Sequence, residues 1–124
     1  MAEPAQLPLS SFYRPALQVF EAHLRLRSAG ELERDLAENY AENVLLLTHE
    51  GPYHGHDGVR KAADVLRRFV SDGEYHYRNK YVAGEYAYLE WVAPGRDDAQ
   101  CKGWDGFVIV RGWIVAQMVY FSCG

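Results

Sequence analysis

Asp105 is the residue of this sequence with the clearest potential for acid–base chemistry. It lies in the segment Gly103–Ile109, where the alternation of a strand would place it on the same face as Phe107 and Ile109. That face should be apolar. A carboxyl group in an apolar cavity has its charged form disfavoured, so its pKa rises and it can act as a neutral donor or as a base around neutral pH. Alternatively, Asp105 lies near the end of the strand at the mouth of the cavity, with its carboxyl group bonded to a backbone amide or to an arginine. Both interpretations of Asp105 remain open.

Three histidines could instead suggest metal chemistry. His49, His54 and His56 fall within eight residues, and a His-x-His pair on an extended segment points both imidazoles the same way. No cysteine accompanies them, and a structural role for each histidine is the favoured interpretation. We therefore expect no metal site and no cofactor, with a histidine metal site kept as a minor alternative.

Aromatic residues make up 14% of the chain, more than a core of this size needs. Either Tyr75 and Tyr77 or their polar neighbours must face inward, and the aromatic set is favoured. Tyrosine combines ring area with a hydroxyl that can orient a ligand, so some rings should line a pocket, although the core is the default for each ring taken singly. The candidate substrate-binding residues are Tyr40, Tyr53, Tyr75, Tyr77, Trp91, Phe107, Gln117 and Phe121.

The elements that must position these side chains begin with helices. Leu17, Phe20 and Leu24 recur at helical spacing and predict a helix over residues 11–28, which Gly30 ends. Steps of four from Leu32 through Leu36 to Tyr40 predict a short second helix. A third helix should follow residues 55–58 with Asp57 as its cap. Its expected inward face is Val59, Ala62 or Ala63, Leu66, and Phe69 or Val70.

Strands make up most of the remainder. The apolar run within residues 43–48 predicts a strand covered on both faces. Everything after residue 73 predicts a four-strand antiparallel meander over residues 74–82, 86–93, 100–111 and 113–123. This order is an α+β layout, a cone-shaped α+β barrel with helices packed in the concave face of a curved, mostly antiparallel sheet. We expect residues 1–10 to form a flexible N-terminal arm and residues 11–124 a single domain.

Composition excludes several classes of function. The 124 residues suffice for one core, and the net charge of -4 leaves no basic stripe for a phosphate backbone, so we expect no nucleic acid partner. No apolar run approaches the roughly 20 residues that cross a bilayer, and the first residues lack a signal pattern. We therefore expect no membrane partner and a cytoplasmic location. Cys101 and Cys123 are predicted to be free thiols.

Three segments carry a resemblance to a known family. They are Asp35-Leu36-Ala37-Glu38-Asn39-Tyr40-Ala41-Glu42-Asn43-Val44, Tyr53-His54-Gly55-His56-Asp57-Gly58-Val59-Arg60 and Gly106-Phe107-Val108-Ile109-Val110-Arg111-Gly112-Trp113-Ile114-Val115. In this order they resemble the nuclear transport factor 2-like superfamily, and within it the SnoaL-like domain proteins. The resemblance implies a cone with a mostly apolar cavity, usually a homodimer through the open sheet face. The superfamily includes polyketide cyclases, ketosteroid isomerases, dehydratases and epoxide hydrolases, so the fold alone decides no reaction.

The resemblance also implies roles for single residues. In the ketosteroid isomerase branch, an aspartate matching Asp105 lies in the cavity and donates to a developing oxyanion. His23 falls where that branch carries a cavity tyrosine, and it could supply a hydrogen bond or shuttle a proton. The isomerase base should lie near the end of the first strand, where this sequence has no aspartate but where His49 or Glu50 could act.

The acid–base set of a characterised branch is incomplete here. The cyclase branch places an acid on its final strand, whereas residues 113–123 hold no carboxylate and Gln117 is their only amide. The leading hypothesis is a SnoaL-like protein that binds a small apolar or aromatic molecule with a carbonyl or hydroxyl group. It would catalyse proton transfer of the isomerase, cyclase or dehydratase type, with Asp105 as acid or base and His49 or His23 assisting. The alternative is a non-catalytic dimeric ligand-binding or interaction module, so the sequence leaves open whether the protein is an enzyme.

Overall fold

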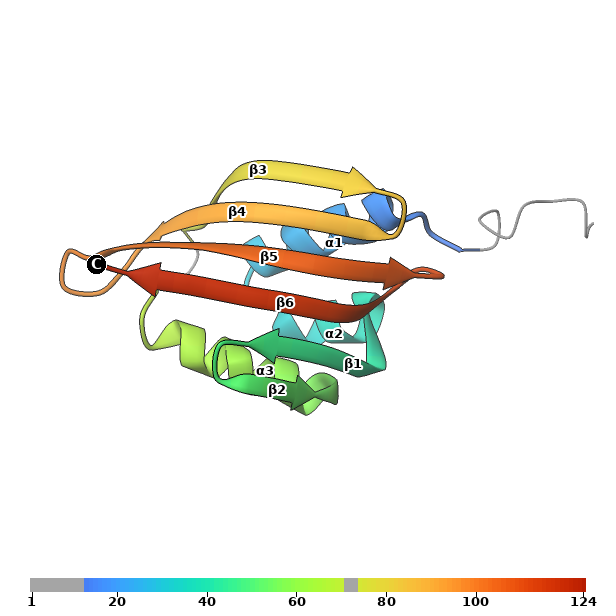
Figure 1. Ribbon diagram of the computed structural model, residues 1–124, viewed down its shortest axis with the longest axis horizontal. Helices are drawn as coiled ribbons and strands as arrows, with labels where there is room; N and C mark the ends of the chain where they lie inside the picture. Colours follow the sequence, from blue (N-terminus) through green and yellow to red (C-terminus); the bar gives the residue numbers. More distant parts are fainter. Residues whose placement is uncertain (1–12, 71–73) are drawn as a thin grey trace, which may run out of the picture.

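The computed structural model describes residues 13–70 and 74–124, so the arm predicted over residues 1–10 lies outside the described residues. In the described part the chain follows an α+β order (Figure 1). The elements are α1 (Ala16–Ser28), α2 (Leu32–Asn39), β1 (Tyr40–Thr48), β2 (Gly51–His54), α3 (Gly55–Arg67), β3 (His76–Ala83), β4 (Tyr86–Pro94), β5 (Gln100–Val110) and β6 (Trp113–Cys123). The strands form a six-stranded sheet in the order β2-β1-β6-β5-β4-β3. Neighbours pair antiparallel except for the parallel pair β1 and β6, which confirms the mostly antiparallel α+β fold.

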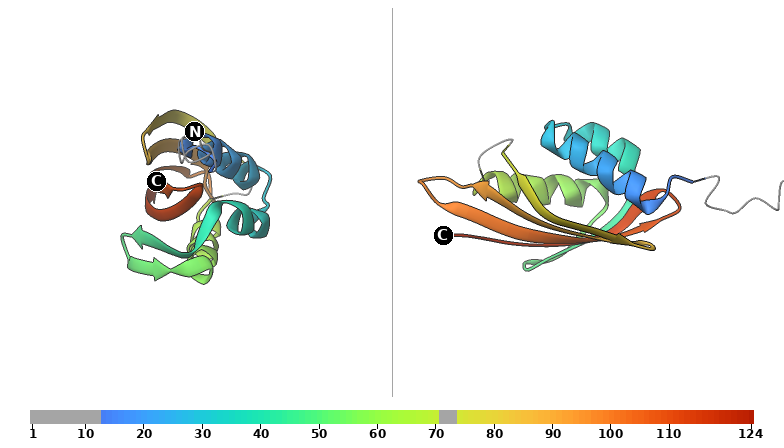
Figure 2. Two further views of the ribbon diagram at one scale, coloured as in Figure 1. Left: turned by 90° about the vertical axis from the view of Figure 1, so that its right-hand side faces the viewer. Right: turned by 90° about the horizontal axis from the view of Figure 1, so that it is seen from above.

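The sheet is curved, and α1, α2 and α3 lie on its concave side (Figure 2). Helix α1 packs against β4, β5 and β6, whereas α3 packs against β1 and β2. Alternate residues of the strands are buried on this side, as Leu89 and Trp91 of β4 illustrate, and they join Phe20 and Leu36 of the helices in the core. The predicted cone, with its helices in the concave face, is therefore confirmed.

The β5–β6 hairpin sets the register on which the concave face depends. Arg111 and Gly112 have φ angles of 52° and 85°, as a two-residue type I′ turn requires at both central positions. Beyond a β-bulge, the register places Phe107 opposite Gln117. Because Asp105 has the same parity along β5 as Phe107, the side chains of Asp105 and Gln117 both face the concave side.

The first two helices form as predicted, with shifted boundaries. Helix α1 begins after Pro15, and Leu17 of its predicted apolar stripe is 52% exposed, because the buried stripe runs through Val19 and Phe20 instead. Tyr40 was predicted to continue the second helix but begins β1, where its backbone is extended. Its ring nevertheless remains in the core.

The third helix forms with a different start. His54 occupies the N-cap position without a side-chain cap bond, so the prediction that Asp57 caps the helix is wrong. Asp57 lies in the first turn, where its carboxylate accepts a hydrogen bond from Arg60 at 2.5 Å. The residues buried on the inward face are Val59, Ala63, Leu66 and Val70, whereas Phe69 is exposed.

Strand β2 was not predicted. Gly51 and Pro52 indicate a turn in a sequence, yet they open a four-residue strand that pairs antiparallel with β1. Proline has no N–H to donate to a neighbouring strand. It is tolerated here because β2 is an edge strand, and one side of an edge strand has no neighbour to pair with. The edge strand carries Tyr53, one of the candidate substrate-binding residues.

The strand predicted over residues 43–48 is covered on one face only. Val44 and Leu46 are buried beneath the helices, but Leu47 is 42% exposed on the convex side of the sheet. The prediction of cover on both faces is therefore wrong for the single chain. An unbroken apolar run does not distinguish a strand buried on both sides from a strand with an apolar outer face.

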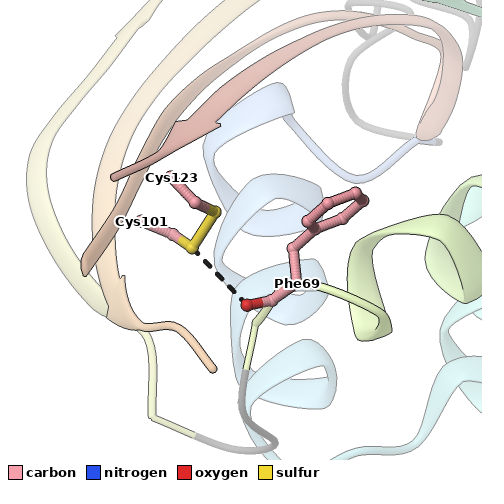
Figure 3. Close-up of a disulfide and its surroundings, with 3 residues drawn as sticks. All are labelled: Phe69, Cys101 and Cys123. Carbon is pink, nitrogen blue, oxygen red and sulfur yellow. Dashed lines mark hydrogen bonds between the residues drawn. A yellow bond between two sulfur atoms is a disulfide. The ribbon is translucent and has the colours of Figure 1, made fainter. Parts of the chain in front are cut away.

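Cys101 and Cys123 are not free thiols: they form a disulfide (Figure 3). The register of β5 and β6 places the two residues directly opposite each other, with their Cα atoms 4.0 Å apart. The Cys101 sulfur also lies 3.6 Å from the carbonyl oxygen of Phe69. The prediction failed because it counted cysteines and did not consider which strand positions the hairpin brings together.

No helix in the described ranges is long and apolar enough to cross a membrane. The cytoplasmic location remains a prediction. The disulfide counts against a reducing compartment, since cellular reductants there keep thiols reduced.

We predict that opening the disulfide lowers the free energy of unfolding by about 3 kcal/mol, because the crosslink restricts the unfolded chain between residues 22 apart. Urea unfolding with and without reductant measures the change. The variant Cys123→Ser alters the exposed partner and leaves the buried Cys101 in place, so its unfolding midpoint should not respond to reductant. Two titratable thiols in the unfolded, unreduced wild-type protein would contradict the assignment.

Candidate functional site

A cavity lies between the concave face of the sheet and the helices. The space that the centre of a water molecule can occupy in it is about 80 Å³, enough for several waters or for part of a small ligand. Its walls are mostly apolar and include Leu24 of α1, Leu46 of β1, Leu66 of α3 and Leu89 of β4. A few polar side chains face the same space, which is the usual composition of a small-molecule site.

The structure brings most of the predicted site residues to this cavity. The candidate catalytic residues His23, His49 and Asp105 all line it. So do the candidate substrate-binding residues Tyr40, Tyr53, Tyr75, Tyr77, Trp91, Gln117 and Phe121. Phe107 is not among the lining residues: it is buried, and its ring packs edge-on against those of Phe20 and His23.

A row of hydrogen bonds crosses the concave face beneath the cavity. The Tyr40 hydroxyl donates to Oε1 of Gln117 at 2.5 Å. The Gln117 amide then donates through Nε2 to Oδ2 of Asp105 at 2.8 Å. From the other side, the indole N–H of Trp91 donates to Oδ1 of Asp105 at 3.1 Å. The row takes one side chain from each of β1, β6, β5 and β4, so the order of the strands in the sheet builds it.

This row determines the state of Asp105. Burial raises the pKa of its carboxyl group above the ordinary value, and the N–H bonds from Trp91 and Gln117 oppose part of that rise. Because both oxygens accept an N–H, the surroundings are arranged for the carboxylate form. Asp105 is thus a carboxylate in an apolar cavity with an increased affinity for a proton, which suits a general base.

Gly103 makes the position of Trp91 possible. A Cβ atom added at Gly103 would lie 2.5 Å from a carbon of the Trp91 ring and 2.6 Å from the carbonyl oxygen of Tyr120. The indole therefore lies directly against the backbone of β5, two residues from Asp105. A glycine inside a strand often marks such a close approach, and this is a signal that the sequence contains.

A second polar chain runs behind the cavity. His23 Nδ1 lies 2.7 Å from Oδ2 of the buried Asp35, whose other oxygen accepts a hydrogen bond from Asn39 at 2.8 Å. Arg14 donates to Oδ1 of the Asn39 side chain at 2.9 Å. Since a carboxylate only accepts, Nδ1 of His23 carries the hydrogen, and the ring is held in one orientation.

The other ring nitrogen of His23 has no hydrogen-bond partner among the described residues. His23 is buried and lines the cavity, and Nε2 has no hydrogen-bond partner among residues 13–70 and 74–124. No side-chain nitrogen or oxygen of the described residues is both fully buried and without a hydrogen-bond partner. Nε2 of His23 is therefore not fully buried. Nε2 is therefore the ring nitrogen that remains available for a hydrogen bond, and His23 is one of the residues that line the cavity.

His49 lies at the rim and not in the polar row. It is exposed in the turn between β1 and β2, and its ring packs edge-on against Tyr120 and Phe121. Beside it, the Tyr53 hydroxyl donates to Glu50 at 3.0 Å. His49 therefore lines the cavity from its rim, whereas Asp105 lies in the polar row on the concave face.

The histidines do not assemble into a metal site. His56 donates from Nε2 to the Tyr40 carbonyl oxygen at 3.0 Å, and His54 is exposed before α3. Within the described ranges, no group of three histidine, cysteine, aspartate or glutamate side chains is arranged to hold a metal ion.

Sequence reasoning missed Asp35 and Arg27, although both had a signal. Asp35 and Asn39 are spaced by four residues on the buried side of α2, where polar side chains need partners. Arg27 follows Phe20, His23 and Leu24 at helical spacing, so it extends the inward face of α1. Either pattern could have indicated a polar side chain at the cavity.

No family model matches the sequence, and the search of curated proteins likewise finds no match. Solved structures do match. A protein from Kribbella flavida DSM 17836 has a TM-score of 0.75 at 14% identity, over 87% of each chain. An NTF2-like protein from Burkholderia pseudomallei has a TM-score of 0.69 at 16% identity, over 86% of this chain and 90% of that one.

A steroid delta-isomerase from Pseudomonas aeruginosa has a TM-score of 0.69 at 20% identity, over 86% of this chain and 79% of its own. Identities this low establish a shared fold and leave the reaction open. The matches span most of each chain. The chain therefore has the NTF2-like cone fold, as its sequence resemblance to that superfamily implies.

Proposed function

We propose that this protein binds a small, largely apolar molecule in its cavity and catalyses proton transfer on it, with Asp105 as the general base. The observation that carries the proposal is the carboxylate of Asp105, oriented by N–H donors from both Trp91 and Gln117 within an apolar cavity. A desolvated, oriented carboxylate of raised pKa is what abstraction of a weakly acidic proton from carbon requires.

The geometry supports the following roles. Asp105 takes the proton from a carbon next to a carbonyl group, and the electron pair of the broken C–H bond moves to the carbonyl oxygen. His23, whose Nε2 has no partner among the described residues, provides a hydrogen bond to that oxygen, and Asp35 positions the imidazole. Asp105 is less suited to the donor role, because both of its oxygens already accept N–H bonds.

The cavity itself favours an enzyme over a purely structural module. A cone filled by side chains would support the non-catalytic alternative, whereas this cone retains a cavity of about 80 Å³ with polar groups on two walls. The structural neighbours are consistent with this proposal, since one of them is described as a steroid delta-isomerase.

We further propose that the protein is a homodimer through the convex face of the sheet. Leu47 of β1 lies opposite Met118 of β6, and Trp104 of β5 lies opposite Tyr120 of β6. All four side chains are exposed in the single chain and form a continuous apolar strip. An apolar strip of this kind on a soluble domain is typical of a protein interface.

Asp105→Asn should lower the rate of base catalysis at least about 100-fold, because it removes the proton acceptor while nearly preserving shape. The rate of ring opening of 5-nitrobenzisoxazole measures this, since that reaction reports on a desolvated carboxylate base. Glu42→Gln is the matched control, because Glu42 is exposed and does not line the cavity. An unchanged rate in Asp105→Asn would exclude the role of Asp105.

The rate should rise with pH as Asp105 loses its proton, with a midpoint above the ordinary 3.8. The contribution of Asp105 to stability changes with pH in the opposite direction to the rate. Since folding raises this pKa, the stabilising contribution of protonated Asp105 is complete below the unfolded-state pKa and is lost as pH rises through the folded-state pKa. Urea midpoints of wild type and Asp105→Asn across this window should therefore diverge with pH, and parallel profiles would contradict the assignment.

Met118→Asp should convert the dimer to a monomer of 14.2 kDa, because it places a charge in the centre of the apolar strip. Sedimentation equilibrium measures the mass. Leu17→Asp is the control, since Leu17 is an exposed apolar residue on α1, away from the convex face. A wild-type protein that is already monomeric at micromolar concentration would contradict the proposed dimer.

A further inference from the structure

Arg27 is a cation placed in the wall of the cavity. It lies in the last turn of α1, it is half-buried, and it lines the same cavity as Asp105. Its guanidinium carbon lies 5.7 Å from the centre of the Tyr75 ring, a cation–π contact that holds the side chain over the aromatic wall. No other lysine or arginine of the described residues lines this cavity.

Arg27 lacks a carboxylate partner. Arg34, Arg60 and Arg67 each pair with an acidic side chain, but Arg27 forms no salt bridge with any described residue. A half-buried guanidinium is costly to keep without an anion, because the cation–π contact replaces only part of its hydration. The fold therefore maintains a site for a negative charge that its own described side chains do not supply.

The charge of Arg27 acts across the cavity. Burial raises the pKa values of Tyr75 and Tyr77, and the nearby Arg27 guanidinium opposes that rise in both. It also opposes the rise in the pKa of Asp105. A ligand in this cavity would thus lie near both a cation and a carboxylate.

The setting favours a single negative charge over a phosphate. Arg27 is at the carboxyl end of α1, where the helix dipole is negative, and the cavity contains no second lysine or arginine within the described ranges. The cavity also contains the carboxyl groups of Asp105, Asp35 and Glu50, which would repel a dianion. The planar fork of one guanidinium suits a carboxylate, which it can bind through two parallel N–H bonds.

We propose that the ligand of this cavity is a small monocarboxylate, whose carboxylate binds Arg27 while its apolar part extends toward Asp105. The assignment deepens the proposed function, since it names the class of substrate on which Asp105 would act. It places the selectivity for charge in Arg27 and the chemistry in Asp105, so the two can be tested separately.

The test compares a charged probe with its neutral isostere. Binding of 3-phenylpropanoate and 3-phenylpropanamide is measured by calorimetry in wild type, Arg27→Met and Arg25→Met. We expect wild type to bind the carboxylate about tenfold more tightly than the amide. Arg27→Met should abolish this preference without weakening the amide, because methionine keeps the apolar stem. Arg25 is exposed on the same helix and does not line the cavity, so Arg25→Met makes the same change in charge and should retain the preference.

Equal affinity of wild type for the two probes, a preference that survives Arg27→Met, or no binding of either probe would overturn the proposal. The result is independent of catalysis, because binding is measured without turnover. A carboxylate preference that depends on Arg27, together with a rate of base catalysis that is unchanged in Asp105→Asn, would support this inference and reject the proposed function. The reverse combination would reject this inference alone.

Discussion

The site depends on one constraint: a carboxylate placed in an apolar cavity must be given hydrogen bonds by side chains that the fold itself aligns. Transfer of an ion from water to such a place costs several kcal/mol unless polar groups replace part of its hydration. Trp91 and Gln117 provide those groups for Asp105, one for each oxygen. Tyr40 in turn fixes the Gln117 amide, so that its N–H and not its oxygen faces the carboxylate. The hairpin register, the bare backbone at Gly103 and the strand order all serve this alignment.

A second alignment holds the other side of the cavity. Arg14, Asn39, Asp35 and His23 form a chain of hydrogen bonds that joins the segment before α1 to α2 and then to α1 itself. Its effect is to hold the imidazole of His23 in one orientation at the wall of the cavity. Two polar groups of different chemistry, Asp105 and His23, therefore approach the same space from the sheet and from the helices. The apolar walls between them lower the local polarity and strengthen both interactions.

Much of this arrangement could be predicted from local pattern, because the concave face is built from alternating residues. Alternation alone placed Asp105 inward and chose Tyr75 and Tyr77 over their neighbours, and all three side chains line the cavity. The features that escaped prediction all depend on contacts between distant segments. The pairing of Cys101 with Cys123 requires the hairpin register, and the bonding of Gln117 to both Tyr40 and Asp105 requires the order of three strands. Strand β2 escaped because its glycine and proline are typical of a turn, and only its position at the sheet edge makes them acceptable.

The most direct test is the titration of the Asp105 carboxyl carbon by NMR in the wild-type protein. The structure predicts a pKa above the ordinary 3.8, because burial outweighs the two N–H bonds. It also predicts a further rise in Trp91→Phe, where one of those N–H donors is removed. A wild-type pKa at or below 3.8 would contradict the placement of Asp105 in an apolar cavity, and with it the role of this residue as the base.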